Sequence, residues 1–287
     1  MTELDVQRRP AGAIPGPDSL IWRYAGDWRG AFSGRATLLL QVAHPVVGAG
    51  VADHSGFLED RWGRLLRTVE STIDFLGYRG EERGRREAAR LREIHKDIKG
   101  VDAQGRRYHA LNPEAYLWVH ATLLHGMLQA QRLFATPVPP DRERVLYAEW
   151  VQLALALGIT ERHIPATPAA FHDYFDTMVN ERLEDNATVR LLIELDRRPL
   201  PPPPRWPLPV FAWSGIALPP TRVLGKLGVG CLPPVLRERF GLRWTAGDET
   251  RFRLFCRMMR AADGVLVEPL RYTPIASRAM RRARRGR

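Results

Sequence analysis

The sequence predicts an all-α protein with one multi-helix domain. Apolar residues recur at helical spacing along most of the chain, and several of these stretches begin or end at capping residues. No segment alternates convincingly between apolar and polar residues, and no internal repeat is present. Since 45% of the 287 residues are hydrophobic, the chain can bury a sizeable core. We therefore expect many helices packed around a single core.

Composition divides the chain into three parts. Residues 1–18 contain several prolines and glycines, which predicts a flexible leader. Residues 19–268 form the expected domain, and residues 269–287 form a basic C-terminal helix or tail. Within the domain, the proline-rich residues 197–209 predict an extended linker. The run at 210–228 is too apolar to stand alone, so we expect the linker to cross the surface of one domain.

The helices have recognisable boundaries. Residues 36–55 are apolar on nearly all sides and should be buried, with a break or kink at Pro45. Gly100 is expected to end a charged helix, and Asn112 followed by Pro113 is expected to begin the next. Helices are expected over residues 60–77, 81–100, 113–134, 141–158 and 167–183, with two more after residue 245.

The net charge of +11 is concentrated in arginine. Most arginines are mixed with Glu and Asp along helices, which favours a solvated surface over a binding face. Residues 277–287 are the exception, since they hold six arginines and no acid, and they could touch phosphates or anionic lipid. Basic and aromatic residues are not interleaved, so no specific nucleic-acid partner is expected.

The two cysteines, Cys231 and Cys256, do not suggest a disulfide framework, so a reducing compartment is expected. We find no apolar segment of signal-peptide or membrane-spanning length. The expected location is cytoplasmic, with peripheral membrane contact through the basic tail as an open alternative.

Most enzyme signatures are missing. The chain has no P-loop, strand-bound GxGxxG, HExxH or GxSxG, and it lacks the Glu-x-x-His of carboxylate-bridged di-iron sites. One polar strip stands out, because Arg64, Arg67 and Thr68 share a face of an otherwise amphipathic helix. It is either a surface arginine pair with Thr68 bonded to its own helix, or a strip aimed into a cavity.

Several of the eight histidines lie in apolar or helical surroundings. His44 is inside the most apolar segment, either as a core residue bonded to backbone or as part of a pocket wall. His120 lies on a long helix, and its spacing of five from His125 excludes joint chelation from a regular helix. His95 lies at the edge of an apolar stripe, where a lone histidine is usually structural.

Six segments follow one another along the chain: QVAHPVVGAGVADHS, RWGRLLRT, LREIHKDIKG, LWVHATLLHGML, YAEWVQLALALGI and LPPVLRERFGLRW. In this order they resemble the catalytic domain shared by latex-clearing rubber oxygenases and MpaB-type oxygenases. The similarity runs from about residue 20 to about residue 262. Members of that family are all-α and bind haem b, so the resemblance implies a haem pocket, with its iron, inside the helical domain.

The resemblance also implies roles for individual residues. The family's proximal iron ligand lies in an Arg-x-x-His helix, which implies His95 as the ligand and Arg92 as a partner of a haem propionate. Arg64 and Thr68 match distal residues of the rubber oxygenases, whereas Arg67 stands where those enzymes have a lysine. Because a guanidinium stays protonated and is a poor iron ligand, we do not expect a haem capped from this position.

A catalytic acidic residue lies upstream of that helix in the family. Asp53 is the best candidate here, and Glu59 and Asp60 are its rivals. His44 and His120 are candidates for further residues of the cofactor pocket.

The implied function is a haem b-dependent oxygenase that uses O2 on an apolar small molecule, such as an isoprenoid or another alkene. Oxidative cleavage of a C=C bond, or a related oxidation, would be the reaction. One alternative is a haem-binding protein without turnover. The other is a basic helical protein that binds an anionic membrane or nucleic acid.

Overall fold

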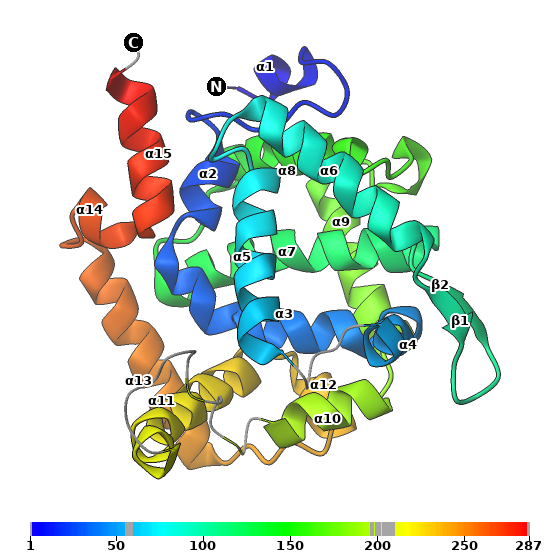
Figure 1. Ribbon diagram of the computed structural model, residues 1–287. Coiled ribbons are helices and arrows are strands. Elements are labelled where there is room, and N and C mark those ends of the chain that lie inside the picture. The colour runs from blue at the N-terminus through cyan, green and yellow to red at the C-terminus, as the bar shows by residue number, and fades with distance from the viewer. Residues whose placement is uncertain (1, 55–59, 196–197, 199–201, 203–209, 286–287) are drawn as a thin grey trace.

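The computed structural model describes residues 2–54, 60–195, 198, 202 and 210–285, which are almost entirely helical (Figure 1). The predicted all-α class is confirmed. The elements, in chain order, are α1 (Glu3–Gln7), α2 (Leu20–Ala25), η1 (Trp28–Gly30), α3 (Ala31–Ala43), α4 (Pro45–His54), α5 (Arg61–Phe75), α6 (Glu81–Lys96), β1 (Lys99–Val101), β2 (Arg107–His109), α7 (Pro113–Phe134), α8 (Pro140–Ala156), η2 (Glu161–His163), α9 (Pro168–Thr177), the π-helical turn η3 (Met178–Arg182), α10 (Ala187–Leu195), α11 (Val210–Cys231), α12 (Pro234–Arg239), α13 (Ala246–Asp263), α14 (Glu268–Arg271) and α15 (Pro274–Arg285).

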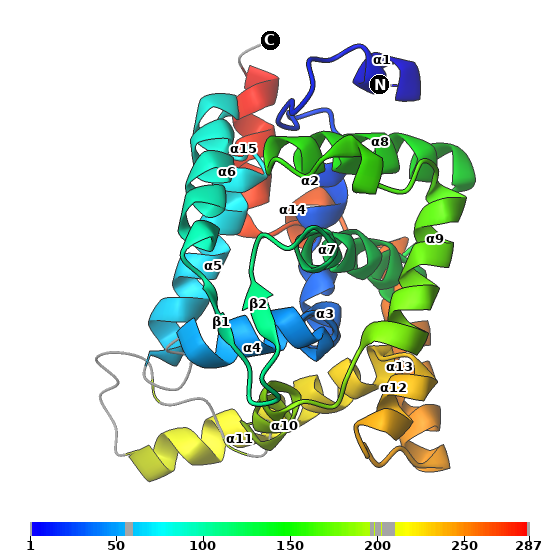
Figure 2. The same ribbon diagram turned by 90° about the vertical axis from the view of Figure 1, so that its right-hand side faces the viewer.

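The long helix α7 runs through the middle of the molecule and contributes to two clusters of buried apolar side chains (Figures 1 and 2). Leu117 and Leu124 belong to a cluster shared with α2, α5, α8 and α15. Trp118 and Phe134 belong to the other, which α3 and α10 to α13 complete. As Asn112 caps α7 by accepting from the amide of Ala115, the predicted start of this helix is confirmed.

Pro45 breaks the apolar N-terminal segment, as predicted. Helix α3 ends at Ala43 and α4 begins at Pro45, with a bend of 98°. The break leaves carbonyl groups without helical partners, and the chain after η3 supplies donors. The Asn186 side chain donates to the carbonyl of Val42 at 2.7 Å, and the Glu184 amide to that of Ala43 at 2.8 Å.

Within the described residues, no single helix has the length and hydropathy needed to cross a membrane. The stretch Trp28–Ala43 together with Pro45–His54 meets the criterion only as a pair across the sharp bend.

Helices α5 and α6 form a hairpin that borders the candidate site. Asp60 begins α5, because its Oδ1 accepts a hydrogen bond from the amide of Gly63 at 2.8 Å. Gly77 follows the end of α5 with φ of 78°, a conformation that suits glycine. The predicted amphipathic helix ending at Gly77 is confirmed.

The end of α6 differs from the prediction. This helix stops at Lys96, and Gly100 lies instead in β1, where it pairs with Tyr108 of β2. The expectation of no strand is therefore wrong for this antiparallel hairpin. Strands of three residues are too short to show an alternating pattern. A Cβ on Gly100 would lie only 2.7 Å from the Tyr108 hydroxyl oxygen, so this close pairing depends on glycine.

The leader was expected to be flexible, but the structure packs it against the domain. Val6 and Ile14 are buried, and the amide of Gly12 donates to Oε1 of Gln152 on α8 at 3.0 Å. A Cβ on Gly84 would lie 2.6 Å from the Ile14 side chain, so Ile14 occupies a notch at a glycine of α6. Isolated apolar residues give no periodic signal, which is why the sequence does not reveal this docking.

Most of the proline-rich stretch 197–209 lies outside the described residues. After it, α11 runs along α3, and a Cβ on Gly228 would lie 2.6 Å from the Arg35 side chain. The Gln129 side chain of α7 donates to the carbonyl of Cys231, at the end of α11, at 2.7 Å. The C-terminal half of the apolar run therefore packs into the same helical assembly.

Candidate functional site

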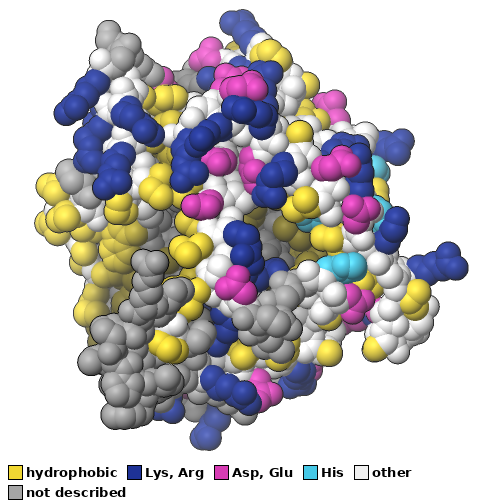
Figure 3. Space-filling model, in the orientation of Figure 1, with side chains coloured by type: hydrophobic (Ala, Val, Ile, Leu, Met, Phe, Trp, Pro, Cys, Tyr) yellow, Lys and Arg dark blue, Asp and Glu magenta, His cyan; other side chains and the backbone are white. Residues whose placement is uncertain are grey.

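Apolar side chains of α5 and α7 are exposed in the middle of the molecule. Leu65 and Val69 of α5 are 46% and 44% exposed. Leu123 of α7 is 42% exposed although Thr122 and Leu124 beside it are buried. Figure 3 shows this face hollowed beside α5, with hydrophobic side chains in the hollow. Uncovered apolar surface on a central helix is typical of a binding site for an apolar group.

His95 lies on α6, the helix that packs against α5. Its Nδ1 is 2.5 Å from the carbonyl oxygen of Leu91, one helical turn earlier. A ring nitrogen that faces a carbonyl must carry the proton and donate it, so in the neutral imidazole the lone pair is on Nε2. This orientation leaves Nε2 as the ring nitrogen that could ligate a metal, because a backbone carbonyl holds the other nitrogen, as is common for ligating histidines.

Tyr116 of α7 packs against His95 and was not singled out in the sequence. The two rings meet edge to face with centroids 5.5 Å apart. The Tyr116 hydroxyl is buried and makes no hydrogen bond within the described part of the chain. Burial raises the pKa of Tyr116 to about 12, against the opposing charge of Arg92. The only sequence signal was an aromatic residue in the first turn of α7, which is too common to point to a site.

Arg92 is one turn before His95, and its side chain reaches the residue that follows α8. Its Nη1 donates to the carbonyl of Gly158 at 3.2 Å. Gly158 has φ of 77°, and a Cβ there would overlap the Arg92 guanidinium. Arg92 thus ties α6 to the end of α8.

The three residues of the polar strip on α5 do not converge. Arg67 is exposed and pairs with Asp60, at the start of its own helix, at 3.0 Å. The Thr68 hydroxyl donates to the carbonyl of Arg64 at 2.9 Å, within the helix. The Arg64 side chain is half-buried, and burial, reinforced by Arg67, lowers its pKa. A guanidinium nevertheless stays charged, so Arg64 brings a cation to this part of α5.

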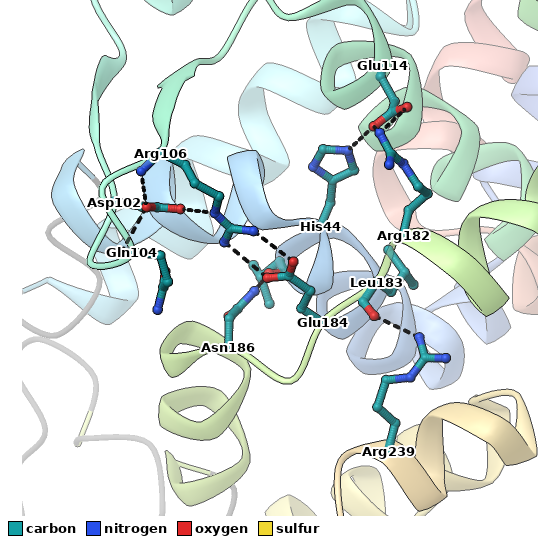
Figure 4. A network of polar contacts seen from close by, with 11 residues as sticks. His44, Asp102, Gln104, Arg106, Glu114, Arg182, Leu183, Glu184, Asn186 and Arg239 are labelled. Atoms are coloured by element: carbon teal, nitrogen blue, oxygen red, sulfur yellow. Dashed lines mark hydrogen bonds and ion pairs between the residues drawn. The ribbon is translucent and has the colours of Figure 1, made fainter.

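His44 lies buried at the break between α3 and α4. Its Nε2 is 3.3 Å from Glu114, which also pairs with Arg182 of η3 at 2.8 Å (Figure 4). Burial lowers the pKa of His44, and Glu114 opposes this shift. Its Nδ1 is buried without a partner among the described residues.

His120 lies in the core between α7 and α8. Its ring stacks on Trp150 at 4.7 Å, and Nε2 donates to the carbonyl of Trp150 at 3.1 Å. Burial lowers the pKa of His120 to about 4, so the ring is neutral at pH 7. Its contacts are those of a core histidine, although Nδ1 has no partner in the described structure.

The acidic candidates have different surroundings. Asp53 is exposed at the end of α4 and accepts a hydrogen bond from the hydroxyl of Tyr108 on β2. Asp60 caps α5, and the bonds from Gly63 and Arg67 lower its pKa. Glu59 lies outside the described residues. Of the two candidates that the structure describes, Asp53 is the one that does not cap a helix.

Side chains alone do not form a metal centre in the described structure. Across residues 2–54, 60–195 and 210–285, no cluster of three or more His, Cys, Asp or Glu side chains could hold a metal ion. A histidine with an available ring nitrogen could instead ligate a metal that is already held by an organic cofactor.

Comparison with protein families identifies the domain. Residues 22–261 match the family described as ER-bound oxygenase mpaB/B'/Rubber oxygenase, catalytic domain. The chain belongs to this family. The resemblance seen in the six segments is confirmed, and the MpaB/rubber oxygenase catalytic domain extends from α2 into α13.

Two curated relatives are similar over most of their length. They are the uncharacterized protein Mb2261 of Mycobacterium bovis and the uncharacterized protein Rv2237 of Mycobacterium tuberculosis. Each is 24% identical over 248 residues, which covers 80% of this chain and 88% of the relative. No solved structure matches the chain.

Proposed function

We propose that this MpaB/rubber oxygenase domain is a haem b-dependent oxygenase that uses O2 to cleave a C=C bond of an apolar small molecule. The observation that carries the proposal is the hydrogen bond of the His95 ring. Its Nδ1–H is held by the Leu91 carbonyl, which leaves Nε2 for iron.

The residues present fit a haem. The exposed apolar side chains of Leu65, Val69 and Leu123 offer an uncharged surface for a macrocycle. Tyr116 keeps the His95 ring in place from the side, since their edge-to-face contact restricts rotation. Arg92, although engaged with Gly158, has further guanidinium hydrogens that could pair with a propionate.

When bound, the haem iron would supply the centre at which O2 is activated. His95 would hold that iron through Nε2. Arg64 would offer a fixed positive charge to an oxygen species that gains negative charge. Asp53 would hold or accept a proton at its carboxylate, where the Tyr108 hydroxyl orients it. In cleavage, both atoms of O2 end in two carbonyl products, so no further oxidant is consumed.

Arg67 cannot replace the rubber oxygenase lysine as an internal iron ligand. Its guanidinium is paired with Asp60 and cannot become a neutral donor. We therefore propose that the substrate side of the pocket is open to O2 without displacement of a protein group.

The substrate would be an isoprenoid or another alkene, because the side chains exposed in the hollow are aliphatic.

The test is the absorption spectrum of the purified protein, in wild type and in His95→Ala. We expect a Soret band in the wild type that is lost or shifted in His95→Ala and recovered with added imidazole. His172→Ala is the matched control, since His172 is an exposed side chain on α9, across the molecule from α6 (Figure 2). Its spectrum should equal that of the wild type.

Two results would contradict the proposal. A wild type that stays colourless with added haemin has no haem site. A His95→Ala variant with an unchanged Soret band would show that another residue ligates the iron. Uptake of O2 with an apolar alkene then separates an oxygenase from a haem protein without turnover.

A further inference from the structure

A pocket lined by four arginines lies where α15 crosses the turn between α5 and α6. It has a volume of about 560 Å³. Arg79 and Arg83 line it from the turn and from the start of α6, and Arg278 and Arg282 from α15. Tyr78 and Ile275 complete its walls, and none of the lining residues is acidic.

The positions of these arginines follow from how α15 is held. Ala276, Ala279 and Met280 are buried against the domain, which fixes the helix along one face. Arg278 and Arg282 are four residues apart and therefore lie together on an adjacent face. The Arg282 guanidinium also donates to the carbonyl of Tyr78 at 3.3 Å, which anchors it at the pocket.

The positive charges are poorly compensated. Arg79 pairs with Asp74 at 3.3 Å, but no carboxylate in the described part of the chain pairs with Arg83, Arg278 or Arg282. Like charges that line one pocket repel one another unless an anion lies between them.

The acidic residues in the first turn of α6 are engaged elsewhere. Glu81 pairs with Arg85 at 2.6 Å and Glu82 with Arg86 at 3.6 Å, and neither lines the pocket.

The first turn of α6 adds hydrogen-bond donors. This 16-residue helix begins after Gly80, which lines the pocket and provides no side-chain cap. Its first amides therefore lack side-chain acceptors, and the positive end of the helix lies at the pocket wall. Helix amides combined with guanidinium groups are the donor set that binds phosphate.

We propose that this pocket binds a phosphate-bearing anion, of the size of a diphosphate or of a phosphorylated headgroup. Guanidinium groups from two separate elements contact the anion from opposite sides. Binding would also hold α15 against the α5–α6 turn. Figure 3 shows Lys and Arg side chains gathered along α15 and over the start of α6, around this place.

The test is calorimetric titration of the full chain with inorganic pyrophosphate at low ionic strength. We expect saturable binding that the double variant Arg83→Gln/Arg278→Gln weakens by about tenfold or more, because two charge-assisted contacts are lost. The matched control is Arg86→Gln/Arg281→Gln. It removes equal charge from α6 and α15 outside the pocket and should change the affinity less than about twofold.

Vesicles distinguish the two sources of the phosphate. Co-sedimentation with vesicles that contain phosphatidic acid is measured for the same three proteins. Pocket-dependent binding of pyrophosphate alone identifies a soluble ligand, and pocket-dependent binding to vesicles identifies a headgroup.

Absence of saturable binding in both assays, or equal loss in the pocket and control variants, overturns the proposal. Circular dichroism verifies that all variants are folded. Because neither assay depends on haem, failure of this site is distinct from failure of the oxygenase proposal.

Discussion

At the scale of single residues, burial decides what a titratable side chain does. His95 and His120 have the same chemistry, but His120 is stacked on Trp150 in the core, whereas His95 is half-buried on α6 with its Nδ1 at the Leu91 carbonyl. The same contrast holds for acids. Asp60 accepts bonds at an exposed helix start, whereas Glu149 of α8 lies in the core and accepts the amides of Leu20 and Ile21.

Glu149 makes folding stability depend on pH. Burial raises its pKa from 4.5 to about 7, against the two backbone hydrogen bonds. Below pH 4.5 the carboxyl is protonated in both folded and unfolded states. Between pH 4.5 and 7 the folded protein keeps a proton that the unfolded chain releases, so stability falls as pH rises. Above pH 7 both states are ionised and the loss, roughly 3 kcal/mol, is complete.

Glu149→Gln should remove this contribution. We expect the free energy of unfolding in urea to vary less between pH 5 and 8 in the variant than in the wild type. Glu70→Gln, at an exposed position of α5, should keep the wild-type pH dependence. An unchanged pH dependence in Glu149→Gln would show that another group is responsible.

At the scale of elements, a segment without a periodic hydrophobic pattern can be held in place by the helices it packs against. The leader docks because Ile14 fits against Gly77 and Gly84, at the ends of α5 and α6 that face each other. A Cβ on Gly77 would lie 2.8 Å from the Ile14 side chain, and one on Gly84 would lie 2.6 Å from it. The leader thus supports the hairpin that carries His95.

Ile14→Ala should therefore destabilise the protein. A buried isoleucine truncated to alanine costs about 2–5 kcal/mol, because apolar contacts are lost and a cavity remains. Chemical denaturation measures the difference. Leu4→Ala is the control, because Leu4 is 63% exposed on α1 and its loss should cost less than about 0.5 kcal/mol. Equal effects of the two changes would mean that the leader is not docked in solution.

At the scale of the whole molecule, a buried ion pair joins distant parts of the chain. Arg29 of η1 is 1% exposed and pairs with Asp27 at 2.5 Å and with Asp263 of α13 at 2.7 Å. It also donates to the carbonyl of Phe134, at the end of α7. Asp263 in turn accepts from the amide and hydroxyl of Thr136. The N-terminal, central and C-terminal helices thus meet at one guanidinium.

Asp263→Ala should lower the free energy of unfolding by about 3–5 kcal/mol, because it leaves a buried guanidinium with one carboxylate fewer. Arg85→Ala removes the exposed pair with Glu81 on α6 and should cost less than about 1 kcal/mol. Thermal unfolding compares the two. A small effect of Asp263→Ala would mean that water replaces the carboxylate, and the pair would then not hold the three regions together.

The sequence by itself determined the helical class, the break at Pro45, the cap at Asn112, and the family. These depend on local periodicity, on proline and glycine geometry, and on motif order, which all act over short stretches of chain. The hairpin at Gly100, the docking of Ile14 and the uncovered face at Leu123 were decided only in the tertiary structure. Each depends on which segments pack against one another, and local sequence patterns do not specify those contacts.

In the candidate site, too, some features follow from the local sequence and others depend on tertiary packing. Arg64, Arg67 and Thr68 share a helix face by spacing, yet Arg67 turns to Asp60 because an exposed carboxylate lies within reach. The free nitrogen of His95 follows from the helix itself, since the Leu91 carbonyl lies one turn before it. The contact of Tyr116 with His95 joins α7 to α6, and the arginine pocket joins α15 to the α5–α6 turn. These elements are separate in the sequence, so only tertiary packing brings their side chains together.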